Sequence, residues 1–321
     1  MQVPGGRSDP ARAASSAVLT RSSAGAASDF SAPSAAAHTF ASSPAPMPAA
    51  APRLIVSDID GTFITSANRV TPRLRDTITR AVSAGAHFGL ATGRPHRWLI
   101  PVLEQLPLAP VCVCANGAVV YDPSSDTVLH AFELAPDAMA DVVGAVERAL
   151  DGVPHGYGVE RVGSSALDPE DECFLITPEY NPDAWDSRFG VVDTQTLISE
   201  PAAKLLVRCA AMTSAQMYEL IAPAVDAELA HATYSMDEGL IEFSLPGVNK
   251  AAGAQFLAER YGVGASEVIA FGDMPNDIEL LTWAGTGVAM ANASPVLHDA
   301  ADMVTLANDE FGVAAVLERW F

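Results

Sequence analysis

Two carboxylates placed one residue apart, Asp58 and Asp60, are the strongest candidates for chemistry in this chain. They follow Leu54–Val56, a short apolar run that predicts a buried strand. Like charges at the end of a buried strand repel each other, so this pair requires a cation between its members, a shifted pKa, or both. Gly61 comes next and allows the tight turn that carries both side chains clear of the strand.

Two further polar groups stand at the ends of predicted strands. Residues 92–94 (Thr-Gly-Arg) follow a strand predicted over 87–91, and residues 273–277 (Asp-Met-Pro-Asn-Asp) follow one predicted over 267–271. Ligands of open α/β sheets bind at the carboxyl ends of the strands, so we expect these groups to meet the first acidic pair. Asp58, Asp60 and Asp273 would form an oxygen-rich site for a hard divalent cation, for which Mg²⁺ is the best candidate.

A cation beside a carboxylate nucleophile indicates phosphoryl transfer, which needs positive charge on the phosphoryl oxygens and an in-line nucleophile. Asp58 can attack phosphorus and form an aspartyl phosphate. Asp60 can protonate the leaving oxygen and then deprotonate water. Thr92 can donate its hydroxyl and backbone N–H to the phosphoryl group, and Lys250 offers a compact positive charge.

The elements around these residues alternate between strand and helix, which predicts a parallel sheet with right-handed crossovers. Thr71-Pro72 opens the first predicted helix, because threonine caps helices and proline suits their first position. In chain order we expect a helix over 71–84, strands over 87–91 and 111–115 with a helix to about 106 between them, and an extended stretch over 118–121. The alternation returns with a helix over 250–261 and strands over 267–271 and 287–290.

Residues 122–246 break this rhythm and predict an inserted α+β domain. A strand is expected over 127–134, and a hairpin over 231–245 turns at Asp237-Glu238-Gly239. We therefore expect a doubly wound, parallel α/β sheet domain over 51–121 and 247–321, with an inserted α+β domain over 122–246. Residues 1–50 are rich in Ala, Ser and Pro and predict a disordered tail. An organellar transit peptide and a true start at Met47 both account for such a tail.

The net charge of −21, from 39 acidic and 18 basic residues, argues against nucleic acid and against anionic membrane surfaces as partners. No uncharged run is apolar enough to predict a membrane span. The four cysteines show neither metal-ligand spacing nor a disulfide framework, so we expect buried free thiols and a cytoplasmic location. A small phosphorylated substrate is the expected partner, and the sequence carries no signal for an oligomeric state.

Together these motifs resemble the four signature motifs of the haloacid dehalogenase-like hydrolase superfamily. They are D-I-D-G-T at 58–62, A-T-G-R-P at 91–95, Lys250, and G-D-M-P-N-D at 272–277, in that order. The resemblance covers residues 53–321. The insertion between the second and third motifs, with N-G-A at 116–118 and the closing pattern over 288–311, resembles the Cof-type (IIB) subfamily.

The resemblance implies a Rossmann-like core with an α/β cap, and a Mg²⁺-dependent phosphatase of sugar phosphates or other small phosphorylated metabolites. It implies that Asp58 is the nucleophile and Asp60 the acid and base. The implied metal ligands are Asp58, the backbone carbonyl of Asp60 and Asp273, with Asp277 nearby. The implied phosphate-binding residues are Thr92, Gly93, Lys250 and Asn276, and Arg94 and Asn116 would contact the substrate. Residues 154–182 are the least similar to the family.

Three other functions fit parts of the pattern. A phosphomutase shares the aspartyl phosphate but passes phosphate to a sugar hydroxyl, so phosphate release without a sugar activator would separate the two. A signalling receiver domain lacks an inserted domain and the D-x-D-G-T spacing. A non-catalytic binding protein would be expected to lose Asp58 or Asp60, and both are present.

Overall fold

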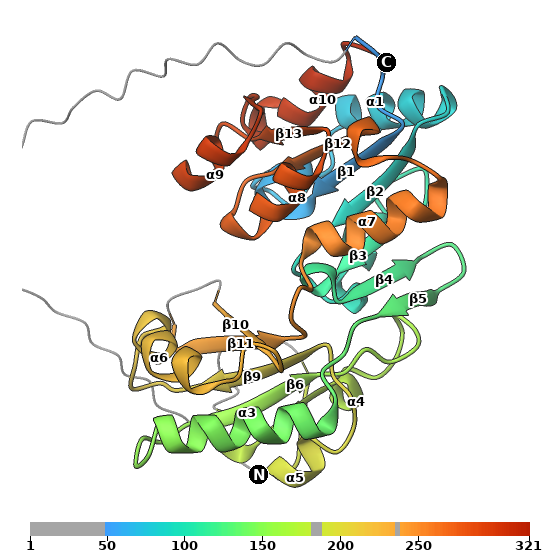
Figure 1. Ribbon diagram of the computed structural model, residues 1–321. Helices are drawn as coiled ribbons and strands as arrows, with labels where there is room; N and C mark the ends of the chain where they lie inside the picture. Colours follow the sequence, from blue (N-terminus) through green and yellow to red (C-terminus); the bar gives the residue numbers. More distant parts are fainter. Residues whose placement is uncertain (1–48, 181–187, 235–237) are drawn as a thin grey trace, which may run out of the picture. The chain divides into compact units, whose positions relative to one another are not determined.

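The computed structural model describes residues 49–180, 188–234 and 238–321, so the tail expected over 1–50 lies almost entirely outside the described residues. Two β-sheets with their own helices make up the described chain (Figure 1). The first sheet is formed by the two ends of the described chain, and the second by the segment between them.

The first sheet has eight strands in the order β14-β13-β12-β1-β2-β3-β4-β5. They are β1 (Leu54–Asp58), β2 (His87–Ala91), β3 (Val111–Cys114), β4 (Val119–Asp122), β5 (Thr127–Ala131), β12 (Val268–Gly272), β13 (Thr286–Ala289) and β14 (Met303–Val304). The strands from β14 to β3 run parallel, and β3, β4 and β5 pair antiparallel. Since β1 lies between β2 and β12, the loops after these three strands lie next to one another.

Capping residues fix the ends of the helices that pack on this sheet. The hydroxyl of Thr71 accepts a hydrogen bond from the N–H of Leu74, as the Thr71-Pro72 motif predicted. The Asn249 side chain accepts one from the N–H of Ala252, and Gly262 ends the same helix in the left-handed region. The helices are α1 (Pro72–Ser83), α2 (Ile100–Leu103), α7 (Lys250–Tyr261), α8 (Ile278–Trp283), α9 (Pro295–Ala300) and α10 (Gly312–Leu317).

The prediction of a single helix between residues 95 and about 106 is wrong. A 3₁₀ turn over His96–Trp98 comes first, and α2 begins only at Ile100. Pro101 has no N–H to donate to the carbonyl four residues back, so a helix cannot run through this position unbroken.

Strand β5 corrects the expected start of the insertion. We expected residues from 122 onward to leave the first sheet, but β5 pairs antiparallel with β4 inside that sheet. The turn between them closes with Asp122, whose carboxylate accepts the N–H of Ser124, and with Asp126 at φ +48°. A short turn returns the chain beside the strand that it leaves, so the second sheet begins only after β5.

The second sheet has six strands in the order β10-β11-β9-β6-β7-β8. They are β6 (Gly156–Glu160), β7 (Phe174–Ile176), β8 (Gly190–Val191), β9 (Lys204–Arg208), β10 (His231–Thr233) and β11 (Leu240–Ser244). Its helices are α3 (Pro136–Ala149), α4 (Glu170–Cys173), α5 (Thr194–Leu197) and α6 (Ser214–Ile221). Strands β10 and β11 pair antiparallel as the predicted hairpin requires, although part of their turn lies outside the described residues.

Strand alternation gives the second sheet two different faces. Tyr157, Val159 and Val207 belong to a core cluster that includes buried residues of α3 and α6. The residues between them in sequence point the other way, because successive side chains of a strand alternate. Only one face of this sheet is therefore covered by these two helices, as the layering in Figure 1 also shows.

All four cysteines are buried and free, as the sequence predicted. Among the residues that the structure describes, no helix combines the length and the apolar composition that a membrane crossing requires.

Gly253 lies where α7 packs closely on β3, and a Cβ built there would overlap Cγ1 of Val113. We expect Gly253→Val to lower the free energy of unfolding by about 1–3 kcal/mol through overpacking. Gln255→Val places the same side chain on an exposed position of this helix and should change stability by less than about 0.5 kcal/mol. Chemical denaturation measures both variants, and equal losses in the two would contradict the close packing.

Candidate active site

The turn after β1 separates the two carboxylates of the first motif. Asp58 ends β1 and is buried, whereas Asp60 is exposed. Gly61 follows at φ +75°, and a Cβ at this position would collide with the carboxylate of Asp273. Both the backbone conformation and the close approach therefore require glycine here.

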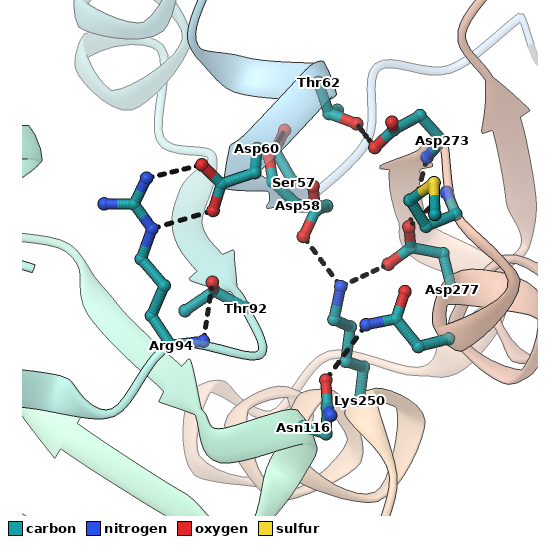
Figure 2. A network of polar contacts seen from close by, with 12 residues as sticks. Ser57, Asp58, Asp60, Thr62, Thr92, Arg94, Asn116, Lys250, Asp273 and Asp277 are labelled. Atoms are coloured by element: carbon teal, nitrogen blue, oxygen red, sulfur yellow. Dashed lines mark hydrogen bonds and ion pairs between the residues drawn. The ribbon is translucent and has the colours of Figure 1, made fainter. Parts of the chain in front are cut away.

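Lys250 connects the buried carboxylates (Figure 2). It is the first residue of α7 and is 1% exposed. Its Nζ lies 2.7 Å from Oδ1 of Asp58 and 2.6 Å from Oδ1 of Asp277. One ammonium group thus links the end of β1 to the loop after β12.

A second set of hydrogen bonds holds this loop in place. Oδ2 of Asp277 accepts the backbone N–H groups of Asp273 and Met274, each at 3.1 Å. The Thr62 hydroxyl donates to Oδ1 of Asp273 at 2.9 Å. Carboxylate oxygens of Asp58, Asp273 and Asp277 lie within 4.8 Å of one another. The two acidic loops therefore meet, as the strand order predicted.

The cluster holds more negative charge than Lys250 can balance. Burial raises the pKa of Asp58 well above its usual value, against the opposing attraction of Lys250. Burial also raises the pKa of Asp273 to about 6. For Lys250, burial favours the neutral amine, but the carboxylates of Asp58 and Asp277 raise its pKa overall. Three carboxylates around one ammonium leave an excess of negative charge that suits a divalent cation.

Arg94 and Asp60 form an ion pair that the sequence did not predict. Nε of Arg94 lies 2.7 Å from Oδ2 of Asp60, and its Nη2 contacts the other carboxylate oxygen. The backbone N–H of Arg94 donates to the hydroxyl of buried Thr92 at 3.1 Å. The loop after β2 is thereby attached to the turn after β1.

The loop after β3 has an unusual backbone that brings Asn116 into the site. Ala115, Asn116 and Gly117 have φ values of +49°, +55° and +101°. A Cβ at Gly117 would collide with the carbonyl oxygen of Asn249, so only glycine fits there. The side chain of Asn276 donates to Oδ1 of Asn116 at 3.0 Å. Positive φ at a non-glycine residue costs conformational energy and is typical of functional loops.

A cavity of about 420 Å³ opens over these loops. Eight of the ten predicted site residues line it, namely Asp58, Asp60, Thr92, Gly93, Arg94, Asn116, Lys250 and Asn276. The other two, Asp273 and Asp277, are not part of its lining and reach the site through Asp58 and Lys250.

The sequence predicted that the inserted domain would contribute to specificity but did not place the side chains of the second sheet that line this cavity. Its residues in the lining include Glu160, Phe174, Lys204, Leu206, Leu240 and Glu242. A signal for some of them existed: Lys204 begins the apolar strand K-L-L-V-R, and Glu242 interrupts L-I-E-F-S. A charged residue within an apolar strand indicates a partner or a ligand, because an unpaired buried charge is costly.

Comparisons with known proteins place the chain in a family. Residues 55–317 match the family model described as haloacid dehalogenase-like hydrolase. The chain is 29% identical over 273 residues to the 5-amino-6-(5-phospho-D-ribitylamino)uracil phosphatase YitU of Bacillus subtilis, covering 84% of this chain and 98% of YitU. It is 26% identical over 261 residues to the pyridoxal phosphate phosphatase YbhA of Escherichia coli, covering 78% of this chain and 92% of YbhA.

The fold has a solved counterpart as well. The subclass IIB sugar phosphatase BT4131 matches with a TM-score of 0.67 at 18% identity, covering 84% of this chain and 98% of that one. Its likeness supports a Rossmann-like core with a cap. The family match extends over most of the chain and includes every motif named above, so this chain belongs to the haloacid dehalogenase-like hydrolase family.

Proposed function

We propose that this chain is a Mg²⁺-dependent phosphatase that hydrolyses small phosphorylated metabolites, sugar phosphates among them, through an aspartyl phosphate on Asp58. One observation carries the proposal: Asp58 lies in the lining of the cavity with its carboxylate held by buried Lys250. The phosphatase names of its relatives support the reaction class.

In the first half of the reaction, a carboxylate oxygen of Asp58 forms a bond to phosphorus while the bond between phosphorus and the leaving alcohol oxygen breaks. Lys250 fixes the orientation of this carboxylate and lies between it and Asp277. Asp60 donates a proton to the departing oxygen, a contribution of roughly 10²–10⁴-fold in rate.

In the second half, Asp60 takes a proton from a water molecule whose oxygen attacks phosphorus. The bond between phosphorus and Asp58 then breaks, which releases inorganic phosphate and restores the free carboxylate. Arg94 occupies both oxygens of Asp60 in this structure. Proton transfer therefore requires Arg94 to leave, and the negative charge of a bound phosphate is its natural competitor.

The remaining residues bind the phosphoryl group and the substrate. We assign the phosphate to Thr92, Gly93, Lys250 and Asn276, and further substrate contacts to Arg94 and Asn116. Gly93 leaves room for the side chain of Asn116, because a Cβ at position 93 would lie 3.1 Å from Oδ1 of Asn116. Preorganised donors of this kind stabilise the charge of the transition state without reorganisation.

The acidic cluster fits a hard divalent cation in donor type, number and charge. Asp58, Asp273 and the backbone carbonyl of Asp60 would hold Mg²⁺. Both oxygens of Asp277 already accept hydrogen bonds, so its part is to support the site from beside the cation. When bound, the cation would neutralise charge on the phosphoryl oxygens.

A cytoplasmic location accords with four free buried thiols, which persist in a reducing compartment.

A phosphomutase of the same family is the second candidate function. Phosphate release in the absence of any sugar activator would distinguish the hydrolase from it.

We expect Asp58→Asn to reduce phosphate release from p-nitrophenyl phosphate and from sugar phosphates by about 10³-fold or more, because the amide is a poor nucleophile. Asp76→Asn removes the same charge from an exposed position of α1 and serves as the control, with unchanged turnover expected. Phosphate release with Mg²⁺ present measures both. An Asp58→Asn variant that turns over at the normal rate would end this mechanism.

The pKa of Asp273 is raised to about 6 from a usual 3.8, so the stability that a bound cation adds should depend on pH. In the metal-free protein the folded state favours the protonated carboxyl of Asp273. The stability that this preference adds is complete below the usual pKa and is lost as the pH rises through about 6. Above that pH a proton no longer competes with the cation at Asp273, and a cation at 100 times its Kd adds about 2.7 kcal/mol of stability.

Mg²⁺ should therefore raise the Tm more at about pH 7.5 than at about pH 5, as thermal unfolding would measure. Asp273→Asn cannot ionise and should lose most of this difference. A larger Mg²⁺ effect at the lower pH would contradict the assignment of Asp273 to the cation site.

A further inference from the structure

One face of the second sheet forms part of the cavity wall. Glu160 of β6 lies opposite Lys204 of β9, and Glu242 of β11 lies opposite Leu206 of β9. Alternation along each strand then places these four side chains, with Leu240, on the same face. All five line the cavity, whereas α3 and α6 cover the opposite face.

A buried ion pair lies in this wall. Nζ of Lys204 is 2.7 Å from Oε2 of Glu242, and the two side chains are only 10% and 12% exposed. Burial favours the neutral amine of Lys204, but Glu242 and then Glu160 raise its pKa overall. Buried ion pairs add little stability compared with apolar residues of similar size. A ligand that uses these charges accounts for them better than folding does.

Glu160 has an unused hydrogen-bond acceptor. Its Oε2 is shielded from solvent and has no hydrogen-bond partner among the described residues. A buried acceptor without a donor is costly, so a donor brought by a ligand would be bound with a gain in affinity. This face carries two acids and one base, and Arg97, Glu170 and Arg188 also line the cavity. The carboxylate of Glu160 itself, and not the overall charge of the cavity, therefore selects a hydrogen-bond donor.

Away from the catalytic loops, the rest of the cavity lining is mainly apolar, and its charged members are Arg97, Glu170 and Arg188. Phe174, Leu206 and Leu240 come from the second sheet, and Trp98 and Met274 from loops of the first. A chain of hydroxyl groups laid on such a wall would lose its hydrogen bonds to water without replacement. A flat ring would cover these side chains and still bring a donor to Glu160.

We propose that this face binds the leaving-group half of the substrate, and that the substrate is a phosphomonoester of a small ring-containing alcohol that carries a nitrogen hydrogen-bond donor. Glu160 determines the specificity for that donor. The Lys204–Glu242 pair positions the wall beside it. This inference rests on the proposed phosphatase function for the placement of the phosphate over Asp58.

Binding measurements separate specificity from turnover. Calorimetry on Asp58→Asn with Mg²⁺ would compare 3-(aminomethyl)benzyl phosphate, benzyl phosphate and ribose 5-phosphate. We expect the amine-bearing ring to bind about tenfold or more tightly than benzyl phosphate, because a charged hydrogen bond is gained. Benzyl phosphate should in turn bind more tightly than ribose 5-phosphate.

Adding Glu160→Gln to the Asp58→Asn variant should remove most of the preference for the amine-bearing phosphate. The order of benzyl phosphate and ribose 5-phosphate should stay unchanged. Glu172→Gln, at an exposed position of α4, removes the same charge outside the cavity lining and should keep the preference. Thermal unfolding checks that each variant is folded. The ranking of the three phosphates needs no Glu160 variant, so the proposal is tested even if that variant fails to fold.

Three results would overturn the inference: tightest binding of ribose 5-phosphate, no measurable binding of any of the three, or an equal loss of affinity for all three in the Glu160 variant. The last would mean that Glu160 only supports the wall. Turnover of p-nitrophenyl phosphate by the unaltered chain reports separately on the proposed function. A chain with the expected binding order but no turnover would contradict the phosphatase assignment and leave the binding face established.

Discussion

The contact between the Lys250 ammonium and the carboxylates of Asp58 and Asp277 is the interaction on which the rest of the structure depends. All three groups are buried, and burying a charge is tolerable only when it is paired and hydrogen-bonded. Breaking a buried pair typically costs about 3–5 kcal/mol, because the remaining charge is left without compensation. This contact therefore fixes the start of α7, the end of β1 and the loop after β12 as one unit.

The lysine balances only part of the charge that it gathers. Asp273 lies in the same cluster, where the Thr62 hydroxyl donates to its carboxylate, and it is not part of the cavity lining. Burial, and to a smaller extent the charge of Asp277, raises the pKa values of Asp58 and Asp273, so the metal-free site favours the protonated acids. A site that favours protons at its carboxylates in the absence of metal favours a divalent cation when the pH rises, which suits an enzyme of phosphate esters.

The backbone conformation of the surrounding loops positions the side chains of the site. Gly61 and Gly117 occupy left-handed conformations at points where a Cβ would strike a neighbouring loop. Asn116 reaches Asn276 from a strained turn, and Arg94 reaches Asp60 from the loop after β2. Four loops that are far apart in sequence thus contact one another through a small number of polar bonds at the carboxyl ends of adjacent strands.

The sequence predicted the parts of the molecule that have local signals. The β1 strand, the Thr71 cap and the acidic loops are each readable from a few neighbouring residues, and the parallel sheet then follows from their order. The pairing of β5 with β4 was not predicted, because it depends on the turn between the two strands. The break before α2 was not predicted either, although Pro101 is a local signal for it. The Arg94–Asp60 pair and the face carrying Glu160, Lys204 and Glu242 depend on strand register, which only tertiary structure sets.

Anomalous diffraction from crystals containing Mn²⁺ in place of Mg²⁺ would test the central claim most directly, because it locates the cation without reference to activity. The account predicts a single strong peak between the carboxylates of Asp58 and Asp273, beside an undisturbed Lys250–Asp277 contact. A saturating concentration of Mn²⁺ that leaves this cluster without a peak would contradict it.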